Sequence, residues 1–221
     1  MSERHSAATK RVALLQRQGE LTPGAFFSYW AGPHAALASA LPGLTRYTQN
    51  RLVKRVWSRS TEEPDFSFDG VAELEFDGTV ATSILSETAQ QALLEDETKF
   101  IGAITLCRVS PGSRPTWNHR QKIWMACGLS PNQSAVENFV LAIQRTGCAV
   151  FSVEQVESTF HRETLGFESS PPTVLATLWF DPDVNIVDQF SSSHWRDVAA
   201  NCVTRGAAWL VDTIQIVPAL R

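Results

Sequence analysis

The segment FFSYWAGPHAAL, residues 26–37, combines large aromatic side chains with one histidine. A helix would carry on one face the residues that are separated by three, four and three positions: Phe27, Trp30, His34 and Leu37. His34 would then lie among apolar groups, which favour the neutral imidazole over the charged form. A neutral imidazole can take a proton from a carbon beside a carbonyl or from a phenol. The spacing is therefore compatible with a general base that has Phe27 and Trp30 beside its substrate, although the residues alone favour a core histidine satisfied by one hydrogen bond.

The segment LTRYTQNRL, residues 44–52, alternates polar and apolar residues as a strand does. Arg46 and Tyr47 would therefore point to opposite faces of a sheet. If Tyr47 shares a cavity with His34, its hydroxyl could orient a substrate or act as an acid; alternatively it is a strand aromatic with a hydrogen-bonded tip. Arg46 could bind an anionic group of the substrate, or it could be solvated at the surface.

Further ionisable residues are candidates for contact with a substrate. Glu73 and Glu75 share one strand face, so they would be a second acid or base if that face is covered, and solvated charges if it is exposed. His119, His161 and His194 fall in the second half of the chain. Each could reach a shared site, and otherwise each lies at the surface.

The elements that must position these residues follow one another as β-α-β-β-α-β in the first half. Thr22 can cap the first helix, Pro23 suits its first turn, and LPGL at 41–44 ends it. The pattern predicts strands at 11–16, 44–57, 68–76 and 103–109, and helices after Thr22 and at 79–100.

The same order recurs after a segment rich in proline, glycine and serine at 110–119. The residue pattern of the second half predicts strands at 121–129, 148–158, 173–183 and 212–217, with helices at 132–147 and within 185–210. A fixed long period with matching element order indicates duplication. We therefore expect an α+β fold of two tandem ferredoxin-like (βαββαβ) units, residues 8–112 and 119–221, packed sheet to sheet as an α+β barrel within one chain.

Composition and motifs exclude several classes of function. The formal net charge is −4 without basic runs, which argues against nucleic acid as a partner. No run of about 18 apolar residues suggests a membrane span, and the polar N-terminal segment is unlike a signal peptide, so we expect a cytoplasmic protein. The four cysteines and five histidines show no metal-ligand spacing. Nucleotide, flavin and serine-hydrolase motifs are absent as well, so we expect neither a metal nor a cofactor.

The first half resembles the EthD family of the dimeric alpha-beta barrel superfamily. The resemblance spans residues 11–109 and rests on FFSYWAGPHAAL, LPGLTRYTQNRL, FDGVAELEFD and EDETKFI. It implies a barrel of two ferredoxin-like units and a functional role for His34 in the YWxxxH element. The helix at 132–147 has no such element, so the second copy would be degenerate. Relatives in the superfamily include cofactor-free monooxygenases, muconolactone isomerases and polyketide cyclases or dehydratases, so the resemblance does not fix the reaction.

We therefore predict a cofactor-independent lyase or isomerase, similar to a dehydratase or cyclase, that acts on a small apolar or aromatic, carbonyl-bearing metabolite in catabolism or secondary metabolism. His34 would be its base, and Tyr47 would stabilise the developing oxyanion. The alternatives are a cofactor-free monooxygenase of a phenol or quinol and a noncatalytic binding protein for an apolar metabolite. We expect one functional pocket per chain, built mainly by the first half, and assembly into a homodimer is compatible with this arrangement.

Overall fold

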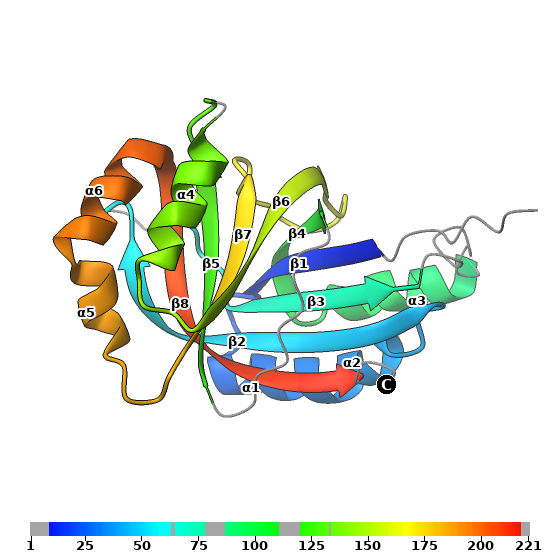
Figure 1. The fold of residues 1–221 in the computed structure, drawn as a ribbon. Coiled ribbons are helices and arrows are strands. Elements are labelled where there is room, and N and C mark those ends of the chain that lie inside the picture. The colour runs from blue at the N-terminus through cyan, green and yellow to red at the C-terminus, as the bar shows by residue number, and fades with distance from the viewer. Residues whose placement is uncertain (1–8, 63–64, 78–86, 111–119, 133, 218–221) are drawn as a thin grey trace, which may run out of the picture.

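The computed structural model describes residues 9–62, 65–77, 87–110, 120–132 and 134–217 (Figure 1). The first half contains β1 (Thr9–Arg17), α1 (Pro23–Tyr29), the π-helical turn η1 (Trp30–His34), α2 (Ala35–Ala38), β2 (Leu44–Ser58), β3 (Gly70–Phe76), α3 (Glu87–Glu97) and β4 (Ile101–Val109). The second half contains β5 (Gln121–Leu129), α4 (Ala135–Gln144), β6 (Val150–Phe160), β7 (Val174–Phe180), α5 (Ile186–Ser191), α6 (Ser193–Cys202) and β8 (Val203–Val217). The expected order of strands and helices is thus present in both halves.

The eight described strands close into one barrel, in the order β1-β3-β2-β8-β5-β7-β6-β4. Each half contributes four neighbouring strands, and all neighbouring strands pair antiparallel. The two four-stranded sheets are therefore joined by hydrogen bonds into one sheet, because β2 pairs with β8 at one junction and β4 pairs with β6 at the other. Closure leaves no unpaired sheet edge between the halves.

Three apolar clusters hold this arrangement together. One cluster fills the barrel interior and includes Trp124 and Trp209. A second lies between α4, α5, α6 and the outer face of the second-half strands, and a third lies between α1, η1, α2 and the outer face of the first-half strands. The helices thus cover the barrel from outside, as Figure 1 shows for α1 and α2 beneath β2 and for α4 and α6 beside β5 and β8. None of the described helices is long and apolar enough to span a bilayer.

The prediction of helical structure within 185–210 was wrong at its C-terminal end. Helix α6 ends at Cys202, and Val203 already begins β8, which continues to Val217. The segment AAWL suits a helix by its local propensity, but Ala207, Ala208 and Trp209 pair with both β2 and β5. Two-sided pairing and burial in the barrel wall outweigh that propensity, so the strand is longer than its local sequence suggests.

Candidate functional site

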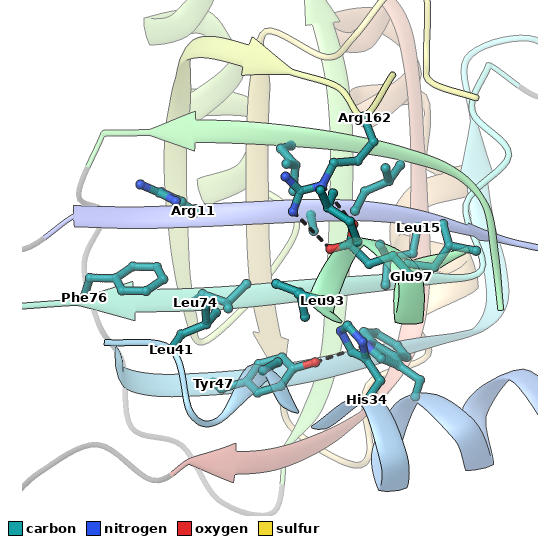
Figure 2. A pocket seen from close by; sticks show the side chains of 18 residues that line it. Arg11, Leu15, His34, Leu41, Tyr47, Leu74, Phe76, Leu93, Glu97 and Arg162 are labelled. Atoms are coloured by element: carbon teal, nitrogen blue, oxygen red, sulfur yellow. Dashed lines mark hydrogen bonds and ion pairs between the residues drawn. The ribbon is translucent and has the colours of Figure 1, made fainter. Parts of the chain in front are cut away.

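A cavity of about 320 Å³ lies between the helices of the first half and the outer face of their sheet (Figure 2). Its walls are mostly apolar and include Ala13, Leu15, Ala72, Leu74, Ile104 and Leu106 from three strands. The polar groups that line it are Arg11, His34, Tyr47, Glu97 and Arg162. An apolar cavity with a few convergent polar groups is typical of a small-molecule site.

His34 enters this cavity from the π-helical turn. Helix α1 begins as expected, with the Thr22 hydroxyl accepting a hydrogen bond from the Ala25 backbone N–H at 3.2 Å and Pro23 in the first turn. Pro33 lacks a backbone N–H and lies within η1, where the wider turn accommodates it. The Trp30 carbonyl accepts a hydrogen bond from Gln49 Nε2 at 2.9 Å, so a side chain from β2 fastens the turn to the sheet.

The same turn changes which residues of the helix face inward. Trp30 and His34 are buried as predicted, but Phe26 is fully buried in place of Phe27, and Leu37 is 43% exposed. The buried positions are therefore spaced by four residues through the wide turn, whereas the prediction assumed a regular α-helix. Phe27 is only partly buried, lies 5.3 Å from the Arg51 guanidinium and does not line the cavity.

A carboxylate holds the His34 imidazole in place. His34 Nδ1 lies 2.9 Å from Asp96 Oδ2, and the Tyr29 hydroxyl donates to Asp96 Oδ1 at 2.6 Å. Burial alone would raise the pKa of Asp96, but the hydrogen bonds from Tyr29 and His34, with the positive charge of Lys99, lower it below its usual value. A charged Asp96 accepts a hydrogen bond from Nδ1–H, so the neutral imidazole carries its lone pair on Nε2. No described residue bonds to Nε2, which is the nitrogen left for the cavity.

Tyr47 lies beside His34 in the cavity (Figure 2). Its oxygen accepts hydrogen bonds from Trp30 Nε1 at 3.1 Å and from Gln49 Nε2 at 2.8 Å. Burial raises the pKa of Tyr47 to about 12, so the phenol remains protonated at neutral pH. Since both neighbours donate to the oxygen, the hydroxyl proton is available for an acceptor in the cavity.

The opposite wall receives a residue from the second half of the chain. Arg162, in the connection between β6 and β7, forms a two-pronged ion pair with Glu97 at the end of α3. Arg162 Nε lies 2.8 Å and Nη2 3.1 Å from the two Glu97 carboxylate oxygens. The second half therefore adds one charged pair to a cavity that the first half otherwise builds.

The sequence of residues 18–103 matches the family model described as EthD domain. This part of the chain is therefore similar to EthD domains. The match includes His34, Tyr47 and Asp96, and it ends before the second half. Among curated proteins, no sequence matches the chain significantly.

Solved structures show the fold of the whole chain around this EthD-like segment. An anthrone oxidase-like protein aligns with a TM-score of 0.57 and 12% identity, over 100% of this chain and 98% of that one. A "putative monooxygenase" from Lactobacillus acidophilus NCFM aligns with a TM-score of 0.52 and 9% identity, over 96% of this chain and 95% of that one. The EthD-like segment thus belongs to a mixed α/β chain with the dimeric alpha-beta barrel fold, here closed within one polypeptide.

Four charged residues of the site were not predicted from the sequence: Arg11, Asp96, Glu97 and Arg162. The acidic pair lies in EDETKFI, a segment that marks the EthD resemblance, at the C-terminal end of α3. Its place in a segment that carries this resemblance was the usable signal for the two acidic residues. No comparable signal exists for Arg162, because its partner Glu97 is 65 residues away in the chain.

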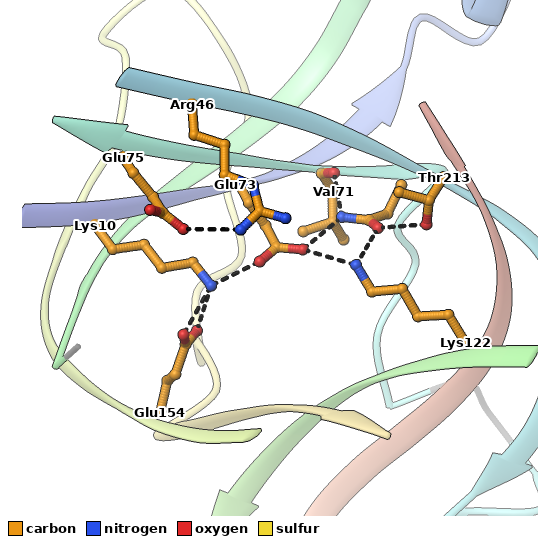
Figure 3. Close-up of polar contacts among 9 residues, drawn as sticks. Lys10, Arg46, Val71, Glu73, Glu75, Lys122, Glu154 and Thr213 are labelled. Atoms are coloured by element: carbon orange, nitrogen blue, oxygen red, sulfur yellow. Dashed lines mark hydrogen bonds and ion pairs between the residues drawn. The ribbon is translucent and has the colours of Figure 1, made fainter. Parts of the chain in front are cut away.

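Glu73 and Arg46 do not reach the EthD cavity, because they point into the barrel (Figure 3). Arg46 and Tyr47 do lie on opposite faces of β2, as the alternation predicted, and Arg46 Nη1 lies 3.6 Å from Glu75 Oε1. Glu73 joins a largely buried ion-pair network, in which its carboxylate lies 2.6 Å from Lys10 Nζ and 3.1 Å from Lys122 Nζ. The strand face that carries Glu73 is thus covered, as one of our two alternatives assumed. It faces the barrel interior, where Glu73 is paired with buried lysines.

The Glu73→Gln variant should be less stable than the wild type by about 3 kcal/mol at pH 7, because it leaves the buried Lys122 ammonium without its carboxylate partner. Burial alone would raise the pKa of Glu73, but Lys10 and Lys122 lower it strongly. A lowered pKa stabilises the fold above the unfolded-state pKa, and this contribution is lost as the pH falls through the folded-state value. Urea titrations should therefore show the difference shrinking below about pH 4.

A half-exposed carboxylate provides the control for that measurement. Glu157 lies 4.0 Å from Arg108, and both side chains are about half exposed, so Glu157→Gln should cost less than about 0.5 kcal/mol. Adding Lys122→Gln to Glu73→Gln should recover part of the loss, since the unpaired charge is then gone. Equal stability of Glu73→Gln and Glu157→Gln would show that the network contributes nothing.

The remaining histidines are not brought to the EthD cavity by the described structure. His161 is exposed and stacks on Phe167, with ring centroids 4.5 Å apart, although its neighbour Arg162 does line the cavity. His119 lies outside the described residues, and His194 belongs to α6, where its side chain is not described. Within the described ranges, no group of three or more His, Cys, Asp or Glu side chains is placed to hold a metal ion.

The second half uses the equivalent space between helices and sheet for packing. Phe139, Ile143, Phe190 and Trp195 are each at most 2% exposed and belong to one cluster. Phe139 and Ile143 come from the apolar stripe that the sequence predicted for this helix. Where the EthD half has an imidazole beside a cavity, the second half thus has a filled apolar core.

Proposed function

We propose that this cavity is the active site of a cofactor-independent lyase or isomerase that removes a proton from a small aromatic or carbonyl-bearing compound. The observation that supports it is the pair of His34 and Asp96, which leaves Nε2 of a buried imidazole for an apolar cavity. A positioned base in a largely apolar cavity is the arrangement that proton removal from carbon acids and phenols needs.

Each polar group has a defined task in this mechanism. His34 Nε2 takes the proton, and the charge of Asp96 stabilises the imidazolium that results. Electron density moves onto the substrate oxygen, where the Tyr47 hydroxyl donates a hydrogen bond to the developing oxyanion. Tyr47 acts as a donor that keeps its proton, because its pKa of about 12 disfavours proton release at neutral pH.

One base is sufficient for both reaction types that we propose. If His34 returns the proton to another carbon of the same anion, the product is an isomer. If the anion instead expels a hydroxide that the imidazolium protonates, the reaction is a dehydration. In either case the proton that leaves the substrate passes through Nε2, so both reaction types depend on the same contact between base and substrate.

Hydrogen exchange in heavy water tests this proposal before the physiological substrate is known. A panel of small aryl ketones, lactones and phenylpyruvate-like acids is incubated with the protein in D₂O and followed by proton NMR. At least one compound should lose its signal at the carbon beside the carbonyl faster with protein than without it. Absence of enzyme-dependent exchange across the panel, with no new product by mass spectrometry, would contradict a base at this site.

A cofactor-free monooxygenase remains the second candidate, because the anion that His34 creates can also react with oxygen. It is favoured by the fold shared with the anthrone oxidase-like structure, a likeness at 12% identity. An oxygen electrode separates the two reactions: uptake matched to product favours the oxygenase, and undiminished turnover under anaerobic conditions favours the lyase or isomerase. A ligand that copurifies unchanged and is never turned over would instead indicate a binding protein.

We also infer that the two halves, residues 8–112 and 119–221, are tandem ferredoxin-like copies of which the first kept the chemistry. The support is the repeated element order, together with a cavity in one half and a filled core in the other. Ligand titration should accordingly saturate at one site per chain.

A further inference from the structure

We propose that the cavity selects a substrate with a carboxylate or similar anionic group, held by Arg11 at the end opposite His34. The inference rests on the proposed function in one respect, namely that this cavity is where the substrate binds. It assigns to Arg11 a role in specificity and to the substrate the class of small aromatic acids.

Arg11 is a cation in the cavity wall without an acidic partner. Its side chain lines the cavity from β1, and none of the described carboxylates forms an ion pair with it. Its guanidinium carbon lies 5.2 Å from the centre of the Phe76 ring, which lines the same end of the cavity. Figure 2 shows Arg11 and Phe76 together at one end and His34 at the other. A cation beside an aromatic ring fits a ligand that combines an aromatic body with a negative charge.

The other charged groups of the cavity leave this positive charge uncompensated. Arg162 and Glu97 neutralise each other in their two-pronged pair. Burial lowers the pKa of Arg11, and the positive charges of Arg108 and Arg162 lower it further. An anion bound at Arg11 would relieve this repulsion, whereas a neutral or cationic group would not.

The strand register sets the spacing between the anion site and the oxyanion donor. Leu74 of β3 pairs with Tyr47 on one side and with Arg11 on the other. Two strand spacings therefore separate the backbones of Tyr47 and Arg11, a distance of about 10 Å. A bicyclic aromatic acid can place its carboxylate at Arg11 while its ring covers Leu74 and its far end approaches Tyr47 and His34.

A matched pair of ligands tests the charge preference directly by binding, without any need for turnover. Isothermal titration with 2-naphthoate and with 2-naphthamide compares the same ring system with and without the negative charge. The wild type should bind the acid about tenfold more tightly than the amide, as expected for a charge-assisted hydrogen bond. The preference should weaken with added salt, because part of the Arg11 side chain remains in contact with solvent.

Variants of Arg11 separate a specific contact from general electrostatics. Arg11→Gln should lose about tenfold in affinity for 2-naphthoate and leave 2-naphthamide unchanged, and Arg11→Lys should retain part of the preference. Arg196→Gln, which removes the same charge from the exposed side of α6, should change neither affinity. Equal binding of acid and amide to the wild type, binding of neither, or an equal loss of both in Arg11→Gln would overturn the inference.

The experiment also distinguishes failure of this inference from failure of the proposed function. His34→Gln should keep the acid preference, since the imidazole does not contact the anion. If the wild type prefers the acid but catalyses no hydrogen exchange, the result supports the anion site and contradicts the proposed chemistry. If the wild type exchanges hydrogen in neutral ketones only and does not prefer the acid, the result supports the chemistry and contradicts the anion site.

Discussion

Replacing His34 with glutamine should lower enzyme-dependent hydrogen exchange about a thousandfold, because glutamine cannot accept a proton at neutral pH. The fold should survive the change, since the glutamine amide can still donate a hydrogen bond to Asp96 in place of Nδ1. Proton NMR in D₂O measures the exchange rate of the panel compound that responds best to the wild type. Circular dichroism and thermal unfolding of the same samples report whether the variant is folded.

A second histidine provides a matched control for that substitution. His161 is exposed and stacks on Phe167 outside the cavity, so His161→Gln should leave the exchange rate within a factor of two or so of the wild type. The two variants carry the same chemical change, and only the one in the cavity should lose activity. A folded His34→Gln protein that keeps more than a tenth of the wild-type rate would remove His34 from the mechanism.

Much of the fold could be predicted because it follows from local patterns. Thr22 and Pro23 define the start of the first helix through the missing partners of its first N–H groups. Alternation in β2 separates Arg46 from Tyr47 irrespective of what covers either face. These signals involve residues within a few positions of one another, where chain geometry alone decides the outcome.

The missed features depend on contacts between distant parts of the chain. The π-helical turn at Trp30–His34 rotates Phe27 out of the cavity, and the contact of Trp30 with Gln49 that fastens it lies 19 residues along the chain. Gly70 also matters, because a Cβ there would lie 2.5 Å from Cζ3 of Trp30, so a bare backbone makes room for the indole. Sequence periodicity assumes a regular helix and cannot anticipate either contact.

The interior charges illustrate a different limit. From the sequence alone, the Glu73 carboxylate could equally be a catalytic group or a solvated charge, because its neighbours in space are not known. Lys10 is 63 residues away and Lys122 is 49 residues away, and together they convert Glu73 into part of a closed ion network. The face it occupies was predictable, whereas Lys122 comes from β5 of the second half and reaches Glu73 because one barrel closes over both halves.

Asparagine in place of Asp96 should also reduce hydrogen exchange on the order of a thousandfold, although Asp96 does not line the cavity. The carboxylate can only accept hydrogen bonds, and it accepts them from His34 Nδ1 and from the Tyr29 hydroxyl. An amide in its place can present its NH₂ group to Nδ1, which favours the tautomer with the proton on Nε2. That tautomer has no lone pair toward the substrate, and the charge that stabilised the imidazolium is also lost.

The tautomer of His34 can be measured directly, and a mere loss of packing around Asp96 would not change it. Nitrogen-15 NMR of the histidine side chains should show His34 protonated at Nδ1 in the wild type and shifted toward the Nε2 form in Asp96→Asn. Asp96→Glu should restore part of the rate, because it keeps a charged acceptor on the same helix turn. Glu95→Gln changes the same charge at the adjacent exposed position and should leave both the spectrum and the rate unchanged. If Asp96→Asn retains the Nδ1 tautomer and near-normal exchange, the carboxylate only packs against the imidazole, and the proposed base lacks its positioning partner.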